Sequence, residues 1–292
     1  MKISTEVGSI SNLVGSERAV ELVAKAGFDC WDFSMWGMAP GYNYSTCEVI
    51  PSEHILAGKD YLKHARKLKQ IGFECGITCN QGHACYPLKI KQIRDTIPRA
   101  IECLCEAGGK ILVVHPFNDE CAEYNAEYFL SILPIAKEYG IEIATENMWN
   151  WDNDNKMASF AACATPEDFC KTVDLVGDSH FGACLDIGHA EMMVPSGTAN
   201  AVDMIYALGD RLKALHIHDN DRRRDQHKLP GEGSIDYKPI IEALYNIGYK
   251  GDFTLEADTH YEHFDKADAM ECVNQLYSRA RMLADKFEAL NK

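Results

Sequence analysis

The segments that decide the fold are IEIATEN (141–147), FGACLDIGH (181–189), KALHIHD (213–219) and DFTLEAD (252–258). Each is a short apolar run of β-forming residues that leads to an acidic or imidazole side chain, namely Glu146, Asp186, His216 and Glu256. Helix-sized stretches separate these segments, which is typical of parallel strands that all end on one face of a barrel. Three carboxylates and an imidazole on that face would repel one another unless a cation joined them. We therefore expect a divalent metal site at a barrel mouth, where the catalytic sites of such folds lie.

The rest of the chain repeats the strand–helix alternation. Strands are expected at residues 2–6, 30–34, 74–78, 110–115, 142–146, 180–186, 213–218 and 252–256. Helices are expected at residues 16–26, 52–71, 90–107, 122–139, 166–176, 199–208 and 237–247, and after residue 267. Glycines that could form left-handed caps follow several of these helices: Gly27, Gly72, Gly108, Gly140 and Gly248. Eight such units predict an α/β fold, a single (β/α)8 TIM barrel over residues 1–292, with no linker that would divide it.

Composition narrows the class of protein. The formal net charge is -15, so a basic groove for a nucleic-acid backbone is not favoured. No apolar run reaches the ~18 residues that a membrane helix needs, and the start MKISTEVGSI lacks the features of a signal peptide. The 12 cysteines are scattered, which favours reduced thiols over a secreted disulfide framework. These features predict a cytoplasmic protein without a membrane partner.

Three long connections are expected on the face where the strands end, at residues 36–51, 147–165 and 220–236. They are rich in aromatic and polar residues: Trp36, Tyr42, Tyr44, Trp149, Trp151, Arg222 and His227. Aromatic rings pack on the C–H groups of sugars while polar groups bind the hydroxyls, so a small-molecule sugar is the expected partner. The alternative is that these rings simply cover the barrel mouth. Exposed aromatic loops are also compatible with a homo-oligomer.

Five segments, TENMWN, CLDIGHA, LHIHDN, DQHKLPGEG and FTLEAD, resemble the signature segments of the xylose isomerase-like barrel superfamily. This superfamily includes sugar isomerases, ketose 3-epimerases and endonuclease IV. The resemblance implies that Glu146, Asp186, His216 and Glu256 bind a divalent metal ion, with Mn, Mg, Co and Zn all open. It also implies that Glu146 and Glu256 are catalytic and that His189 and Arg222 bind substrate.

Two assignments near these segments leave alternatives. His216 matches the H-x-x-D spacing of the superfamily better than His218, although both have the same strand parity. His115 is assigned to substrate binding, with a hydrogen-bonded structural role as the alternative, and the same two roles are open for His83.

The expected activity is that of a divalent-metal-dependent sugar isomerase or epimerase. A metal bound to the carbonyl and hydroxyl oxygens of a sugar would stabilise the enediolate that forms when a carboxylate removes the neighbouring proton. A metal-dependent lyase or dehydratase acting on a keto-sugar, cyclitol or glycoside would use the same chemistry, and a non-catalytic sugar-binding barrel is a further alternative. An abasic-site nuclease similar to endonuclease IV is a second alternative. Residues of the types that bind three zinc ions in endonuclease IV all occur in this sequence, and Asp225 and His227 are among these residues.

Overall fold

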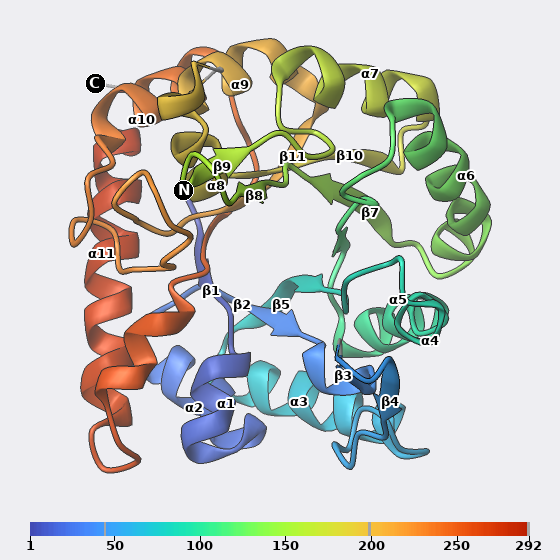
Figure 1. Ribbon diagram of the computed structural model, residues 1–292. Coiled ribbons are helices and arrows are strands. Elements are labelled where there is room, and N and C mark those ends of the chain that lie inside the picture. Colours follow the sequence, from blue (N-terminus) through green and yellow to red (C-terminus); the bar gives the residue numbers. More distant parts are fainter. Residues whose placement is uncertain (44, 198–199, 291–292) are drawn as a thin grey trace.

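A closed ring of parallel strands forms the centre of the molecule, as Figure 1 shows. The structure, a computed structural model, describes residues 1–43, 45–197 and 200–290. A six-stranded sheet has the order β11-β10-β7-β6-β5-β2, and β1 pairs with β12. Parallel bridges from Glu6 to Asp32 and from Ile217 to Leu255 join these two sheets at both edges. The eight strands therefore close into a barrel, which confirms the predicted (β/α)8 fold.

The barrel strands are β1 (Ile3–Thr5), β2 (Cys30–Ser34), β5 (Thr78–His83), β6 (Ile111–Val114), β7 (Glu142–Glu146), β10 (Phe181–Asp186), β11 (Leu212–His216) and β12 (Phe253–Leu255). The helices around them are α2 (Ser16–Ala26), α3 (Tyr61–Cys75), α5 (Ile97–Ala107), α6 (Ala122–Glu138), α7 (Pro166–Val176), α9 (Ala201–Leu208), α10 (Tyr237–Asn246) and α11 (Ala269–Ala289). Short helices α1 (Gly8–Val14), α4 (Lys91–Arg94) and α8 (Ile187–Met192) lie in the connections. None of the described helices is long and apolar enough to cross a membrane.

Helix α7 illustrates how the sequence sets the limits of these elements. The Thr165 side chain accepts a hydrogen bond from the Asp168 N–H, and Pro166 occupies the first helical position, where its missing N–H costs nothing. Phe169 and Val173 are buried on its inner face. Gly177 ends the helix in the left-handed region, with a φ of 58°. The predicted limits, 166–176, are confirmed.

The third strand was predicted wrongly. Residues 74 and 75 belong to α3, and the strand β5 runs instead from Thr78 to His83. The helix passes through Gly72, the expected cap, and ends at Gly76, whose φ is 82°. The sequence of β5 is polar, so a search for apolar runs does not detect this strand.

Two predicted helices have different limits in the structure. The helix predicted at 52–71 begins only at Tyr61, and the one predicted at 90–107 is divided into α4 and α5. Residue 199, the expected start of another helix, lies outside the described residues.

Polar side chains fill part of the barrel interior below the mouth. The Gln81 amide donates to Asp32 Oδ2 at 3.0 Å, and Thr254 Oγ1 lies 3.3 Å from Gln81 Oε1. Ser4 and Asn80 continue the layer, with their side chains 2.8 Å apart. Buried polar groups are stable only when they are hydrogen-bonded, so this network fixes the rotamers beneath the site.

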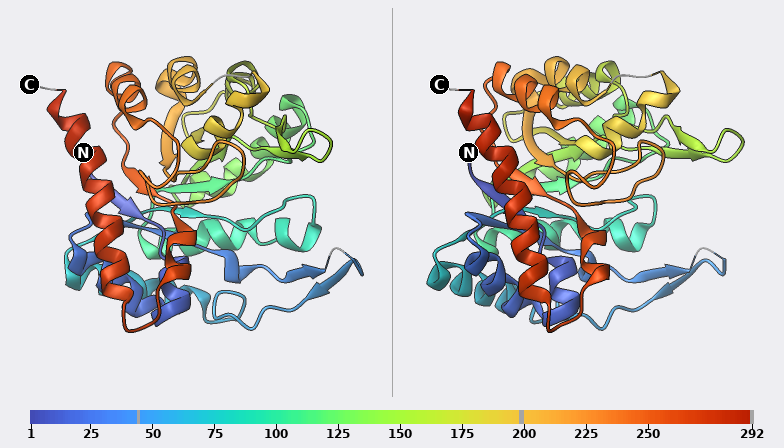
Figure 2. Two further views of the ribbon diagram at one scale, coloured as in Figure 1. Left: turned by 60° about the vertical axis from the view of Figure 1, so that its left-hand side comes forward. Right: turned by 90° about the vertical axis from the view of Figure 1, so that its left-hand side faces the viewer.

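The long connections after β2 and β7 each contain a two-stranded hairpin. The first is β3 (Gly41–Asn43) with β4 (Glu48–Ile50), and the second is β8 (Asn150–Asp152) with β9 (Met157–Ser159). Figure 2 shows both hairpins projecting from the same end of the barrel. This is the end at which the strands terminate, as the sequence predicted. Tyr44, one of the aromatic residues named above, lies outside the described residues.

Candidate metal centre

The four side chains expected to bind metal converge at the barrel mouth. Glu146, Asp186 and His216 are the last residues of their strands, and Glu256 follows directly after β12. Asp186 and His216 are register partners on adjacent strands. One nitrogen or oxygen from each of the four lies within 4.8 Å of the others. Three of the side chains are buried, and that of Glu256 is 11% exposed.

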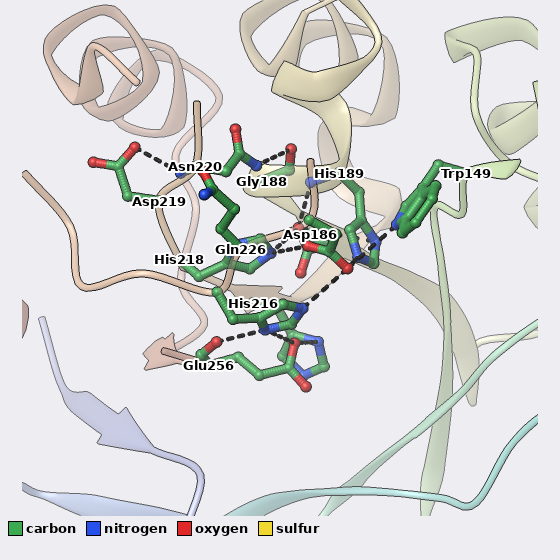
Figure 3. A network of polar contacts seen from close by, with 12 residues as sticks. Trp149, Asp186, Gly188, His189, His216, His218, Asp219, Asn220, Gln226 and Glu256 are labelled. Atoms are coloured by element: carbon green, nitrogen blue, oxygen red, sulfur yellow. Dashed lines mark hydrogen bonds and ion pairs between the residues drawn. The ribbon is translucent and has the colours of Figure 1, made fainter. Parts of the chain in front are cut away.

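The Nδ1 atom of His216 lies at the centre of this first cluster. It is 3.2 Å from Glu146 Oε2. It is also 3.2 Å from Glu256 Oε2, a contact that Figure 3 shows. Burial alone would lower the pKa of His216, but surrounding negative charges, those of both glutamates included, raise it well above its usual value. A site that holds a proton so tightly in a carboxylate cage is also suited to a metal cation in place of that proton.

The donor set fits a divalent ion. His216 Nδ1 and Asp186 Oδ2 are buried and have no hydrogen-bond partner among the described residues. Buried polar atoms without a partner cost free energy, and a divalent ion held by these residues would satisfy them. Three carboxylates with one imidazole form an oxygen-rich set that suits Mn or Mg and also admits Zn or Co.

A second group of ligand-type side chains lies beside the first: His189, His218, Asp225 and His227. Asp225 Oδ2 is 3.3 Å from His189 Nε2 and 3.2 Å from His227 Nε2. His189 Nδ1 lies 2.9 Å from the backbone carbonyl oxygen of Asn147, and His227 Nδ1 lies 2.8 Å from that of Glu256. A carbonyl oxygen can only accept, so Nδ1 is the protonated nitrogen of each ring. Both Nε2 atoms of neutral imidazoles would then turn lone pairs toward a carboxylate. Either additional protons or a cation must lie between these Nε2 atoms and the Asp225 carboxylate. This group of four residues, the second cluster, could therefore hold a further ion.

The loop that carries Asp225 and His227 has an unusual backbone. Arg222 and His227 adopt positive φ values of 61° and 40°, which non-glycine residues rarely do. The Arg222 N–H donates to Asn220 Oδ1 at 2.8 Å, and its guanidinium lies 2.9 Å from Glu191 Oε2. The arginine expected to bind substrate therefore points to α8, and it does not line the cavities described below.

His83 and His115 adjoin the first cluster. Their Nε2 atoms are 3.0 Å apart, and each lies 3.4 Å from Glu146 Oε2. Burial lowers the pKa of His115 to about 4, so this imidazole is neutral. Tyr86 stacks on His115 with ring centroids 4.2 Å apart, and Trp36 lies parallel to His83 at 5.7 Å.

Two cavities open over the site. The first has a volume of about 210 Å³, and its walls include His115, Glu146, Trp149, His189 and Glu256. The second, about 340 Å³, lies between α1 and the segment after β2. The two share Trp36, His83, Glu256 and Asp258. Among the predicted aromatics, Trp151 is on β8, away from both cavities.

Three residues of the site were missed from the sequence. Asp32 lies inside β2 and faces His216, and Tyr86 follows β5, whose limits were wrong. Glu6, one residue beyond β1, is 6% exposed, and burial, followed by the charge of Asp258, raises its pKa to about 7. Glu6 follows its strand just as Glu256 follows β12, so the same pattern could have revealed it.

The sequence and the fold of this chain are similar to those of known proteins. The fructoselysine 3-epimerase of Escherichia coli O157:H7 is 34% identical over 83 residues, which cover 28% of this chain and 26% of that protein. A D-tagatose 3-epimerase-like protein superposes with a TM-score of 0.68 at 24% identity, covering 98% of this chain and 99% of the other. The IolI protein, solved with a bound zinc atom, superposes with a TM-score of 0.73 at 18% identity and the same coverage. The sequence profile of one family matches residues 20–278. The chain therefore belongs to the xylose isomerase-like TIM barrel family.

Proposed function

We propose that this protein is a divalent-metal-dependent isomerase or epimerase of a ketose-type sugar. The observation that carries the proposal is the first cluster, in which Glu146 and Glu256 approach one imidazole nitrogen from two strands at 3.2 Å each. Two of the proteins named above are a fructoselysine 3-epimerase and a D-tagatose 3-epimerase-like protein, although the sequence match with the former spans about a quarter of that protein.

The chemistry follows from the ligands. A divalent ion held by Glu146, Asp186, His216 and Glu256 would withdraw electron density from a ketose carbonyl and make the neighbouring C–H more acidic. Glu146 and Glu256 have the longer carboxylate side chains, so each could reach a substrate carbon as well as the ion. One would remove the proton and the other would return it. Return to the opposite face of the same carbon inverts it, whereas return to the adjacent carbon isomerises the sugar.

The surrounding residues would hold the sugar. His189 and His115 line the smaller cavity together with Trp149. Their imidazoles would flank the hydroxyls of a bound sugar, and the indole would pack on its C–H groups. Arg222 would act at a distance instead, because its ion pair with Glu191 secures the loop that carries Asp225.

Proton exchange tests this proposal. The protein should catalyse loss of a C–H proton from a ketose to D2O when Mn²⁺ is added, and lose that activity with a chelator. Glu146→Gln should lower the rate by at least about 10²-fold, as expected for loss of a group that moves a proton, whereas Glu138→Gln, on the exposed surface of α6, should leave it unchanged. Exchange at the wild-type rate in Glu146→Gln, or none with any ketose tested, would refute the proposal.

The second cluster favours one alternative, an abasic-site nuclease with several metal ions. Incision of an abasic duplex at catalytic rates, with steep dependence on salt, would support it. A lyase would be distinguished by release of water or another leaving group from the exchanged sugar.

A further inference from the structure

The larger cavity at the barrel mouth has no place in the proton-transfer step. Its volume of about 340 Å³ lies within the ~300–1,000 Å³ range of small-molecule sites. It adjoins the metal cluster through Glu256 and His83. A sugar whose reacting carbons lay over the first cluster would therefore extend its other end into this space, an inference that rests on the proposed function.

The walls of this cavity are acidic. Three carboxylates line it, those of Glu6, Glu256 and Asp258, and no lysine or arginine is among its lining residues in the described part of the chain. Neutral hydroxyls, such as those of Ser9 and Ser34, complete the polar surface. An ion on Glu256 would offset that carboxylate but would leave the other two.

Glu6 is the clearest sign of a missing partner. Its side chain lines the cavity, and the residue is 6% exposed. Oε2 accepts a hydrogen bond from the Ser9 N–H at 3.1 Å, whereas Oε1 is buried and has no hydrogen-bond partner in the part of the chain that the structure describes. A buried carboxylate oxygen without a donor costs free energy, so a ligand that donates to it is expected.

The missing partner is not a small metal ion held by side chains. Neither Glu6 nor Asp258 belongs to any group of described ligand atoms close enough to share one ion. Asp258 is also half-exposed, with Oδ1 3.6 Å from His227 Nδ1. A cation that suits separated carboxylates and nearby hydroxyls is an organic ammonium group on a polyhydroxylated chain. An anionic group such as phosphate would be repelled.

We propose that this side cavity binds the non-reacting end of the substrate and that this end carries an amine, with Glu6 as its main partner. The substrate class is therefore an amino-substituted sugar, and sugar phosphates are excluded.

Binding of unreactive probes tests this inference directly. The probes are 1-amino-1-deoxy-D-glucitol, D-glucitol and D-glucitol 6-phosphate, which share a polyol chain but have no carbonyl to react. Affinities for the Mn²⁺-loaded protein would be measured by calorimetry at pH 8. We expect the amino-polyol to bind at least about tenfold more tightly than the neutral polyol, a difference of ~1.4 kcal/mol. The phosphate should bind most weakly.

Variants assign the preference to the cavity. Glu6→Gln should abolish most of the tenfold preference, whereas Glu120→Gln, an exposed carboxylate on the same end of the barrel, removes the same charge and should retain it. Asp258→Asn, at the half-exposed second carboxylate of the cavity, provides an independent variant. Equal or tighter binding of the phosphate, or an undiminished preference in both cavity variants, would overturn the inference.

The probes also separate this inference from the proposed function. If no ketose exchanges protons but the amino-polyol preference depends on Glu6, the isomerase proposal fails and the amine site stands. If ketoses exchange protons but the amino-polyol binds no more tightly than the neutral polyol, the isomerase proposal stands and the amine site fails.

Discussion

The Nε2 atom of His216 lies 3.7 Å from Oδ2 of Asp32, on the opposite side of the ring from the two glutamates. This distance is too long for a hydrogen bond but allows charge attraction. Asp32 is held in turn by Gln81 at 3.0 Å and is 1% exposed. Carboxylates in this position orient metal-binding histidines and make them better donors.

Asp32→Asn should therefore weaken metal binding without removing a ligand. We expect the affinity of the first cluster for Mn²⁺ or Zn²⁺ to fall by about 10–100-fold, the usual effect of losing an outer partner of a ligand. Titration with a metal-sensitive dye would measure it. Asp154→Asn, in the exposed turn between β8 and β9, is the matched control and should bind metal normally. Unchanged affinity in Asp32→Asn would show that the aspartate serves packing alone.

The two histidines of HIHD should have separate roles. His216 groups with Glu146, Asp186 and Glu256, whereas His218 groups with His189, Asp225 and His227. We expect His216→Ala to lose the ion of the first cluster together with proton exchange. His218→Ala should keep that ion and affect the second cluster only. Elemental analysis with exchange rates distinguishes them, with the partly exposed His180→Ala as control. The reverse pattern would transfer the catalytic ligand to His218.

The convergence of Glu146, Asp186, His216 and Glu256 could be predicted from the sequence because each comes at the end of an apolar strand, and this pattern requires no knowledge of packing. It failed for β5, because Asn80 and Gln81 are polar and are stabilised by distant partners, Asp252 and Asp32, that a local pattern cannot show. The direction of the Arg222 side chain could not be read from the sequence either. The resemblance to the superfamily implied that Arg222 binds substrate, but this residue has a left-handed backbone and its side chain points toward Glu191. Contacts between loops depend on such turns more than on spacing.

Metal binding at the second cluster should strengthen as the pH rises. Burial lowers the pKa of His189, but the charges of Asp186 and Asp225 outweigh it and raise the value to about 10 in the metal-free protein. An ion must therefore displace a proton at neutral pH, which makes the apparent affinity rise by about tenfold per pH unit for each proton released. Competition with a chelator at pH 6, 7 and 8 measures the slope. His189→Asn should flatten it by one proton, and a slope that is already flat in the wild type would contradict this assignment.

Glu6 should make the protein less stable than it could be. Its pKa in the folded protein is about 7, above the ordinary 4.5, so the folded state binds more protons than the unfolded chain between these values. The free energy of unfolding therefore falls as the pH rises from 4.5 to 7. The contribution of Glu6 to stability is fully present below pH 4.5, where its carboxyl is protonated in both states, and is lost as the buried group ionises.

Glu6→Gln removes this penalty. It should raise the free energy of unfolding at pH 8 by about 2–3 kcal/mol, slightly less than the full shift implies because the new amide also needs partners, and it should have almost no effect near pH 4.5. Urea unfolding of the metal-free protein at both pH values tests this, with Glu120→Gln as the control. Equal stability of variant and wild type at pH 8 would mean that Glu6 already has a partner for its buried oxygen. A gain in stability combined with loss of amine binding would show instead that the chain retains a destabilising carboxylate because its ligand requires one.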